Sequence, residues 1–310
     1  MRRLRNLRAR LPGRRIGYNC RKRKYSMNFI RSNKTHYFYL RLNKWRRIVQ
    51  ILSVLFFILV PVLILLDVRF ILGNLYSISF WDLEIVDPAM AIQTLILSKT
   101  FLVSLFAAAL IPIVIAFIFG RVFCSWVCPY NSLSEFLEYT ENKIRHFVKR
   151  KRKPVQGKNP KPYFYWLIFI SVLLITFILS FPLIVFLSFP GILTAQAASV
   201  IMGSGVGLLF FFPIIIAIFE LAVSKRFWCK YVCPVGASLA LFRIPNTMHI
   251  EKSESKCDCA GIISPCSNEC PLGLKPEDKN LYPYCFNCGR CIKVCEKTGN
   301  KALFFSFKQK

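Results

Sequence analysis

Histidine and acidic residues are scarce in this chain of 310 residues. It contains 3 histidines and 15 Asp or Glu against 43 Lys or Arg, which gives a formal net charge of +28. His36, His146 and His249 all lie outside the long apolar runs, so a b-type haem held by two histidines within a membrane is not expected. The sequence also lacks a Cys-x-x-Cys-His motif and a glycine-rich phosphate loop. It therefore gives no basis for a c-type cytochrome or a nucleotide-driven pump.

Charged residues are missing from the long apolar runs. Residues 48–66 and 100–120 carry no charged side chain, and none occurs between Lys161 and Glu220. A run of about 20 apolar residues can cross a bilayer as a helix, and the last interval has room for two such helices. We predict an α-helical membrane protein whose four transmembrane helices lie at about 48–66, 100–120, 163–186 and 204–223.

Basic residues are distributed unevenly around these spans. Residues 1–47 contain 17 Lys or Arg and no Asp or Glu, and residues 121–162 contain ten Lys or Arg. The connection 67–98 has only Arg69. The positive-inside rule then predicts a multi-pass protein of a bacterial inner (cytoplasmic) membrane with both termini in the cytoplasm. Attraction to anionic lipid explains the basic tail, so we expect no nucleic-acid partner, although nucleic-acid binding is the second interpretation of residues 1–47.

Two segments repeat nearly the same sequence around a pair of cysteines. Each has the pattern Cys-x3-Cys-Pro, once at Cys124 and Cys128 and again at Cys229 and Cys233. Each half of the predicted membrane domain, 48–244, consists of a span, a proline-marked connection, a second span and this motif. We therefore predict two parallel repeats related by an axis along the membrane normal. The proline after each second cysteine favours the start of a surface helix and disfavours helical geometry at that cysteine.

Symmetric placement suggests that the four repeat cysteines form a site. In that interpretation Cys124, Cys128, Cys229 and Cys233 converge across the repeat axis, where they hold an additional metal centre or act as a redox dithiol pair. In the alternative, they are small buried residues that let helices pack closely. Helix-end amides and nearby basic residues are expected to favour the thiolate form of the second cysteine in each motif.

Eight further cysteines lie in residues 245–310. Cys285, Cys288, Cys291 and Cys295 form the Cys-x2-Cys-x2-Cys-x3-Cys run of bacterial ferredoxins, in which three thiolates bind one cluster and the fourth binds another. The cytoplasm keeps thiols reduced, which favours metal ligation over disulfides. Zinc is the competing metal, but four cysteines at this spacing are hard to place around one tetrahedral ion.

A second cysteine set precedes this run. The ferredoxin crossing predicts two [4Fe–4S] clusters. One would be held by Cys285, Cys288, Cys291 and Cys270, and the other by Cys257, Cys259, Cys266 and Cys295. We predict that residues 245–310 form a small cytoplasmic α+β ferredoxin-like domain that depends on its two clusters to fold. Cys20 has no partner at useful spacing and is predicted to be unligated.

Acidic residues near the spans are weaker candidates. Glu220 lies near the cytoplasmic end of the fourth span, and an ionisable residue at membrane depth is a functional candidate. Pairing with Arg226 or another neighbouring base explains it equally well. Asp82, Glu84 and Asp87 lie on the predicted outer face, where they could line a quinol pocket, but a solvated loop is the favoured interpretation.

In the two Cys-x3-Cys-Pro motifs and the two C-terminal cysteine sets, the chain resembles the NapH/NosR/CcoG group of membrane polyferredoxins over about residues 45–305. The resemblance implies electron transfer between the quinol pool, or a cytoplasmic donor, and a respiratory reductase or its electron-transfer subunit. A cupric (metal) reductase and an assembly factor for a respiratory metalloenzyme are the alternatives. Unlike NosR-like proteins, the chain lacks a large extracytoplasmic flavin-binding domain. An electron-transfer subunit is favoured over a stand-alone oxidoreductase.

Overall fold

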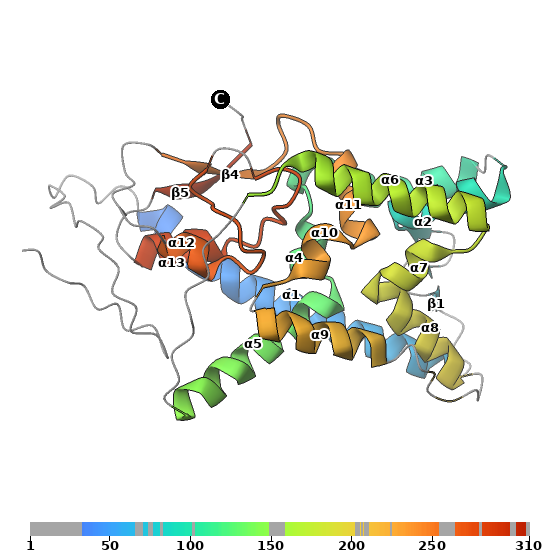
Figure 1. The fold of residues 1–310 in the computed structure, drawn as a ribbon, viewed down its shortest axis with the longest axis horizontal. Coiled ribbons are helices and arrows are strands. Elements are labelled where there is room, and N and C mark those ends of the chain that lie inside the picture. The colour runs from blue at the N-terminus through green and yellow to red at the C-terminus, as the bar shows by residue number, and fades with distance from the viewer. Residues whose placement is uncertain are drawn as a thin grey trace, which may run out of the picture.

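The structure is a computed structural model of the chain, and its description is confined to part of the sequence. Cys20, Cys257, Cys259 and Asp82 lie outside that part. The described residues are 33–65, 71–73, 77–80, 83–100, 103–148, 159–201, 205, 207, 211–223, 225–253, 264–278, 281–297 and 302–307. Over these ranges the protein is mostly helical, with two small antiparallel sheets (Figure 1).

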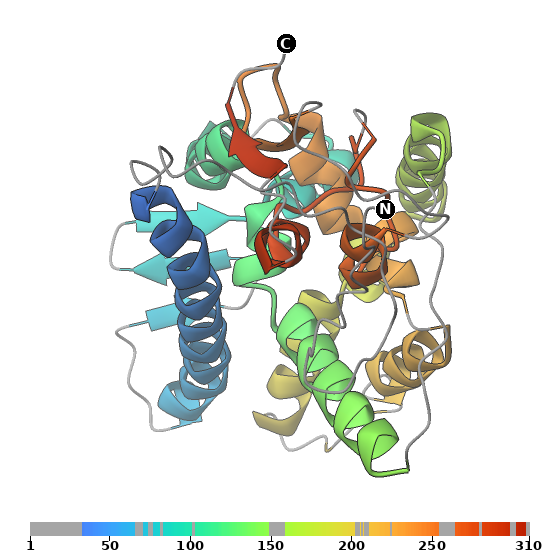
Figure 2. The ribbon, with the colours of Figure 1, turned by 90° about the vertical axis from the view of Figure 1, so that its left-hand side faces the viewer.

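The chain begins with a long helix and a small sheet. Helix α1 (Asn33–Leu65) starts well before the predicted first span and includes the last basic residues of the tail. An antiparallel sheet of order β1-β2-β3 follows and lies beside α1 (Figure 2). Its strands are Ile71–Gly73, Ser77–Phe80 and Leu83–Val86. The sequence analysis did not predict this sheet, because its strands are too short to show a periodic pattern.

Helix α2 (Pro88–Ser98) occupies the connection before the predicted second span. Asp87 caps it, since its carboxylate accepts a hydrogen bond from the amide of Ala89 at 3.5 Å. An aspartate at this position stabilises a helix start. Asp87 therefore has a local structural role, and the proline-marked connection is a helix rather than an open loop.

The predicted spans correspond to helices of differing length. Helix α3 (Val103–Phe119) fits the second span, whereas α6 (Pro162–Leu179) is shorter than the third span of 163–186. It ends where Ser180 adopts a left-handed backbone with φ 49°. Helices α7 (Leu183–Leu187), α8 (Phe189–Ile201) and α9 (Phe211–Val223) follow. Within the described ranges, α6 alone is long and apolar enough to cross a membrane, and α3 and α9 are apolar but shorter.

The two cysteine motifs fold into the same corner. A short helix, α4 (Val122–Trp126) or α10 (Phe227–Tyr231), leads into α5 (Pro129–Phe147) or α11 (Pro234–Leu241). Cys128 has φ −59° and ψ 120°, and Cys233 has φ −61° and ψ 113°. Both lie outside helical geometry with a proline starting the next helix, as the sequence predicted.

The C-terminal segment combines helices and strands. Strands β4 (His249–Lys252) and β5 (Leu303–Ser306) pair antiparallel, and α12 (Pro265–Glu269) packs against α13 (Arg290–Lys297). These elements gather at one end of the molecule, with α4 and α10 between them and the apolar helices (Figure 1). Their core is continuous with that of the apolar helices. Ile292 and Phe286 belong to the same buried cluster as Tyr165 and Phe169 of α6.

Candidate functional site

Four of the C-terminal thiols border one cavity. Cys270, Cys285, Cys288 and Cys291 line a space of about 340 Å³ whose remaining walls are apolar or proline side chains. The amide of Leu274 donates a hydrogen bond to Sγ of Cys270 at 3.4 Å. Apolar walls and amide-to-sulfur hydrogen bonds are the features that protect an iron–sulfur cluster and set its potential.

The loop that presents three of these thiols turns sharply. Asn287 and Gly289 both adopt positive φ, 53° and 71°. Asparagine and glycine tolerate this conformation better than other residues. The side-chain amide of Asn287, through Nδ2, also donates to the carbonyl oxygens of Phe119 at 3.0 Å and Met248 at 2.7 Å. The cysteine loop is thereby fixed to the end of α3 and to the start of the C-terminal segment.

The second predicted set is described only in part. Cys266 of α12 and Cys295 of α13 lie side by side with their thiols hydrogen-bonded. Sγ of Cys295 also accepts a hydrogen bond from the amide of Ala302 at 3.3 Å. Cys270, at the other end of α12, borders the cavity described above. The antiparallel arrangement of cysteines along α12 and α13 thus separates the thiols into two groups.

The repeat cysteines of the two halves meet beside shared apolar clusters. Cys124 and Cys233 border one cluster, Cys128 and Cys229 border a second, and Cys124 and Cys229 both border a third. All four cysteines therefore lie in one region between the two motifs. In the described part of the chain, no group of three or more Cys, His, Asp or Glu side chains is placed to hold a metal ion.

The expectation of thiolates at the second repeat cysteines was wrong. Burial raises the pKa of Cys128 to about 12 and that of Cys233 to about 12. Amides at the starts of α5 and α11 do lower these pKa values, as expected, but burial outweighs them. Without a bound metal, both groups are protonated thiols at neutral pH.

Each motif also carries an arginine whose role the sequence analysis missed. Arg121 and Arg226 lie three residues before the first cysteine of their motifs. Nη1 of Arg226 donates to Oδ1 of Asn131 on α5, and the guanidinium of Arg121 lies against Gly236 on α11. Asn131 and Gly236 each stand two residues after the motif proline. Each arginine therefore crosses to the equivalent place in the other half, and the shared Arg-x2-Cys spacing was the available signal.

Buried ion pairs connect α5 to its neighbours. Arg46 of α1 donates to both carboxylate oxygens of Glu135, at 2.8 and 3.1 Å. Arg290 of α13 does the same to Glu138, at 2.7 and 3.1 Å. Burial acts to raise the pKa of Glu135, but the charges of Arg46, Arg226 and Arg290 outweigh it and hold this pKa below its ordinary value. Helix α5 thus binds α1 and the C-terminal segment together.

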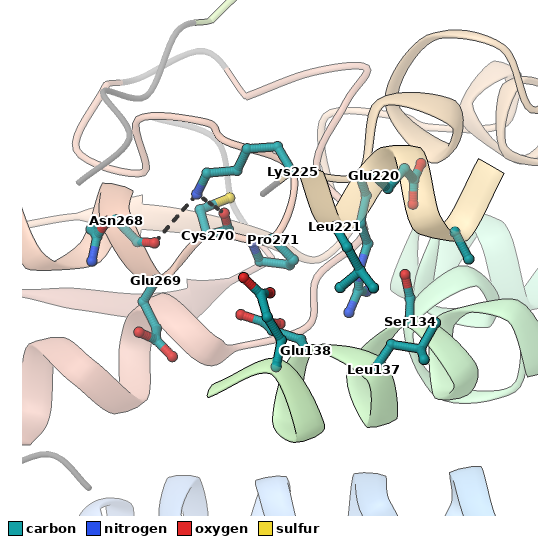
Figure 3. Close-up of a pocket in the computed structure, with 13 residues that line it drawn as sticks. Ser134, Leu137, Glu138, Glu220, Leu221, Lys225, Asn268, Glu269, Cys270 and Pro271 are labelled. Atoms are coloured by element: carbon teal, nitrogen blue, oxygen red, sulfur yellow. Dashed lines mark hydrogen bonds between the residues drawn. The ribbon is translucent and has the colours of Figure 1, made fainter. Parts of the chain in front are cut away.

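Beside these ion pairs, a pocket of about 440 Å³ separates α5 and α9 from α12 (Figure 3). Nζ of Lys225 donates to the carbonyl oxygens of Asn268 and Cys270, at 3.3 and 2.7 Å. Glu220, on another wall, accepts hydrogen bonds from the Tyr130 hydroxyl at 2.7 Å and from the Trp228 amide at 2.8 Å. Lys225 therefore fixes the backbone around one cavity-lining cysteine, and Glu220 fixes the two cysteine motifs to each other.

A much larger open cavity lies between α1, α5 and α13. It holds about 2320 Å³ of empty space. One part of its lining is polar, including Arg46, Gln50 and Lys293, and another is apolar, including Leu55 and Phe136. No local sequence pattern predicts this cavity, because its walls come from helices far apart in the chain.

Known proteins resemble the chain over most of its length. Residues 101–154 and 204–246 match a family model described as a 4Fe-4S binding domain. The chain is 31% identical over 199 residues to Uncharacterized protein MJ0749 of Methanocaldococcus jannaschii, covering 64% of this chain and 69% of that protein. It is 26% identical over 242 residues to Ferredoxin-type protein NapH of Escherichia coli, covering 73% and 77%. It is 28% identical over 263 residues to Methylamine utilization ferredoxin-type protein MauN of Methylorubrum extorquens, covering 83% and 76%. No solved structure matches.

The cysteine cavity and these relatives together define an iron–sulfur electron-transfer protein. The chain belongs to the NapH/NosR-like polyferredoxin family. The two segments that match the family model contain the four repeat cysteines, whereas the eight C-terminal cysteines lie beyond them.

Proposed function

We propose that the chain carries electrons from membrane quinol through two [4Fe–4S] clusters to a respiratory reductase or its electron-transfer subunit. The observation that carries this proposal is the four-thiol cavity next to a large amphipathic cavity, since α13 contributes to the walls of both. The clusters supply one-electron chemistry when bound. The remaining steps, binding and orienting the quinol, belong to the protein's own side chains.

The proposed ligands follow the two thiol groups. Cys285, Cys288, Cys291 and Cys270 hold one cluster, and Cys257, Cys259, Cys266 and Cys295 hold the other. The first set is supported by the one cavity that all four of its thiols line. The second is supported by the contact between the thiols of Cys266 and Cys295. The relatives named as ferredoxin-type proteins support iron–sulfur clusters over zinc.

A location in the bacterial inner membrane is supported by the exposed apolar surface. Only 22% of the 18 residues of α6 are buried. The core helix of a soluble protein would be mostly covered. Ile170 and Ile178 of α6 are 54% and 74% exposed, and Leu59 of α1 is 51% exposed. Large exposed apolar surfaces mark membrane or protein contacts. We propose four spans, cytoplasmic termini, a basic tail over 1–47, a membrane domain over 48–244 and a cluster domain over 245–310.

Quinol is the proposed donor because the large cavity matches its chemistry. A quinol has a polar ring and an apolar isoprenoid tail. Gln50 and Glu135 offer polar atoms to a ring, and Ile51, Leu55 and Phe136 offer an apolar path for a tail. Oxidation to quinone releases two electrons and two protons, which suits two one-electron carriers beside an open polar rim. This lining favours the cavity over Glu84 and Asp87 as the quinol site.

The proposal is tested by quinol reduction of anaerobically purified protein. Eight ligand cysteines predict about eight iron and eight acid-labile sulfide per chain. A decyl-chain ubiquinol should bleach the visible absorption. Leu55→Trp narrows the apolar part of the cavity and should slow this reduction about tenfold or more, because a misplaced donor transfers poorly. Dithionite should still reduce Leu55→Trp fully, and Leu59→Trp, on the same helix but outside the cavity, should behave like the parent.

Each alternative result has a distinct meaning. Stoichiometric zinc without sulfide would contradict the cluster assignment. Clusters that dithionite reduces but quinol does not would indicate a cytoplasmic donor. Equal slowing by the Leu55 and Leu59 variants would remove the large cavity from the route.

We also propose that the four repeat cysteines form one redox-active site. Two observations support this: cysteines from both motifs border the same buried clusters, and the 4Fe-4S family model matches these segments. This arrangement suits either form named in the sequence analysis, an additional metal centre or a redox dithiol pair.

A further inference from the structure

Arg121 is a buried cation, with 4% of its surface exposed. Its Nη1 donates to the carbonyl oxygen of Pro283 at 2.8 Å and to that of Tyr284 at 3.3 Å. Its Nη2 donates to the carbonyl oxygen of Cys229 at 3.3 Å. One side chain therefore joins the peptide that precedes Cys285 to the first cysteine of the second motif.

The acceptors of Arg121 are these backbone carbonyls and the Cys124 thiol rather than a carboxylate. The Tyr165 ring lies 5.4 Å from the guanidinium carbon and adds a cation–π contact. Arg121 and Cys285 line the same small cavity of about 280 Å³. A buried cation is costly unless it stabilises negative charge nearby, and the thiolates of an iron–sulfur cluster would supply that charge.

The second motif provides an internal comparison. Arg226 occupies the equivalent sequence position and is also buried, at 5% exposure. It donates to Asn131, and its Nη2 lies 3.9 Å from Oε1 of Glu135. Arg226 thus faces a carboxylate on α5, whereas Arg121 faces the loop before Cys285. The sequence repeat is symmetric at these arginines, but their surroundings are not.

We propose that Arg121 is a positioning residue for the cluster assigned to Cys285, Cys288, Cys291 and Cys270. Its planar guanidinium group holds the loop before Cys285 against the second Cys-x3-Cys-Pro motif. Its charge raises the reduction potential of that cluster, because a nearby cation stabilises the added electron in a low-dielectric interior. This inference rests on the proposed ligand set, but not on quinol as the donor.

The test is a redox titration of the full chain with a chemical reductant, followed by electron paramagnetic resonance. Arg121→Gln should lower the reduction potential of one cluster and alter its resonance spectrum. The other cluster should keep its parent potential and spectrum. Arg121→Lys keeps the positive charge but lacks the planar guanidinium group. It should therefore keep the reduction potential close to the parent value but not reproduce the parent line shape. Arg226→Gln, the matched control, should leave both potentials unchanged.

Iron content separates the remaining outcomes. Loss of one cluster in Arg121→Gln, with recovery in Arg121→Lys, also supports the proposal. Parent-like potentials and spectra in Arg121→Gln would overturn it, as would loss of both clusters in both variants, which indicates a general folding role. A parent protein without iron–sulfur clusters would overturn the ligand set itself, and a parent that quinol fails to reduce would affect only the proposed donor.

Discussion

Gly236 shows how a single residue adapts one repeat to the other. It lies in helix α11, where a Cβ atom would overlap the Arg121 guanidinium. Asn131, at the equivalent place in α5, instead uses its side chain to accept a hydrogen bond from Arg226. The same position therefore makes room for one arginine and binds the other. Glycine here serves close approach rather than an unusual backbone conformation.

Replacing Gly236 should have opposite effects in two backgrounds. In the parent, Gly236→Ala should lower the free energy of unfolding by about 1–3 kcal/mol, because the added methyl group displaces Arg121. In an Arg121→Ala background the same change should raise it by about 0.5–1 kcal/mol, since alanine is the better helix former. Thermal unfolding in detergent measures both. The same sign in both backgrounds would contradict a close contact between these residues.

At the scale of elements, the repeated corner is the unit that positions the cysteines. In both motifs the amide of the second cysteine donates to the carbonyl oxygen five residues earlier, Cys128 to Phe123 at 3.0 Å and Cys233 to Trp228 at 3.1 Å. The chain then restarts as a helix at the proline. The sequence predicted this corner because it depends on neighbouring residues only.

The protonation of the second cysteine in each motif was mispredicted because the burial of these thiols depends on α2, α6 and α8, which lie far away in the chain.

If the four repeat cysteines act as one site, any single change should cost nearly as much as all four. Each of Cys124→Ser, Cys128→Ser, Cys229→Ser and Cys233→Ser should abolish most electron transfer from quinol, in the non-additive manner of groups that share a site. Iron and sulfide should stay at the parent level. Membranes matched for protein content provide the measurement, and Cys20→Ser is the control. Parent-like transfer in all four variants would make these cysteines packing residues.

At the scale of the whole molecule, the C-terminal segment with its eight cysteines packs continuously against the helices that precede it. The buried cluster that contains Ile292 and Phe286 also contains Tyr165 and Ala237. Arg290 adds ion pairs to α5 and α12. A boundary near residue 245 divides the sequence, but buried contacts cross it. This continuity holds the cysteine cavity at a fixed distance from the repeat motifs, which an electron carrier requires.

Orientation of the whole chain is predicted by its basic residues. Reporter fusions after residues 47, 80, 155 and 310 should report cytoplasm, periplasm, cytoplasm and cytoplasm, because Lys and Arg are retained on the cytoplasmic side. An alkaline phosphatase and a fluorescent reporter at each site make the assay self-controlled. A periplasmic signal at residue 310 would reverse the orientation and place the cysteine cavity outside the reducing compartment.

The sequence by itself determined the features that depend on local pattern. Uncharged runs predicted helices that include α3 and α6, the prolines predicted the starts of α5 and α11, and cysteine spacing predicted the set that lines one cavity. These signals need only a few consecutive residues. The end of α6 at Ser180 and the sheet β1-β2-β3 lacked such a signal.

Only the tertiary structure decided which distant groups meet. Arg121 reaches Pro283 across 162 positions, and Arg290 reaches Glu138 across 152. Cys124 lies with Cys233 beside the cluster around Ile184 and with Cys229 beside the cluster that contains Tyr165. Contacts at such separation depend on how apolar helices pack and on where buried charges find partners, and no local pattern encodes either. The chain therefore specified its cysteine sets in sequence, whereas packing alone set the surroundings that determine how each thiol behaves.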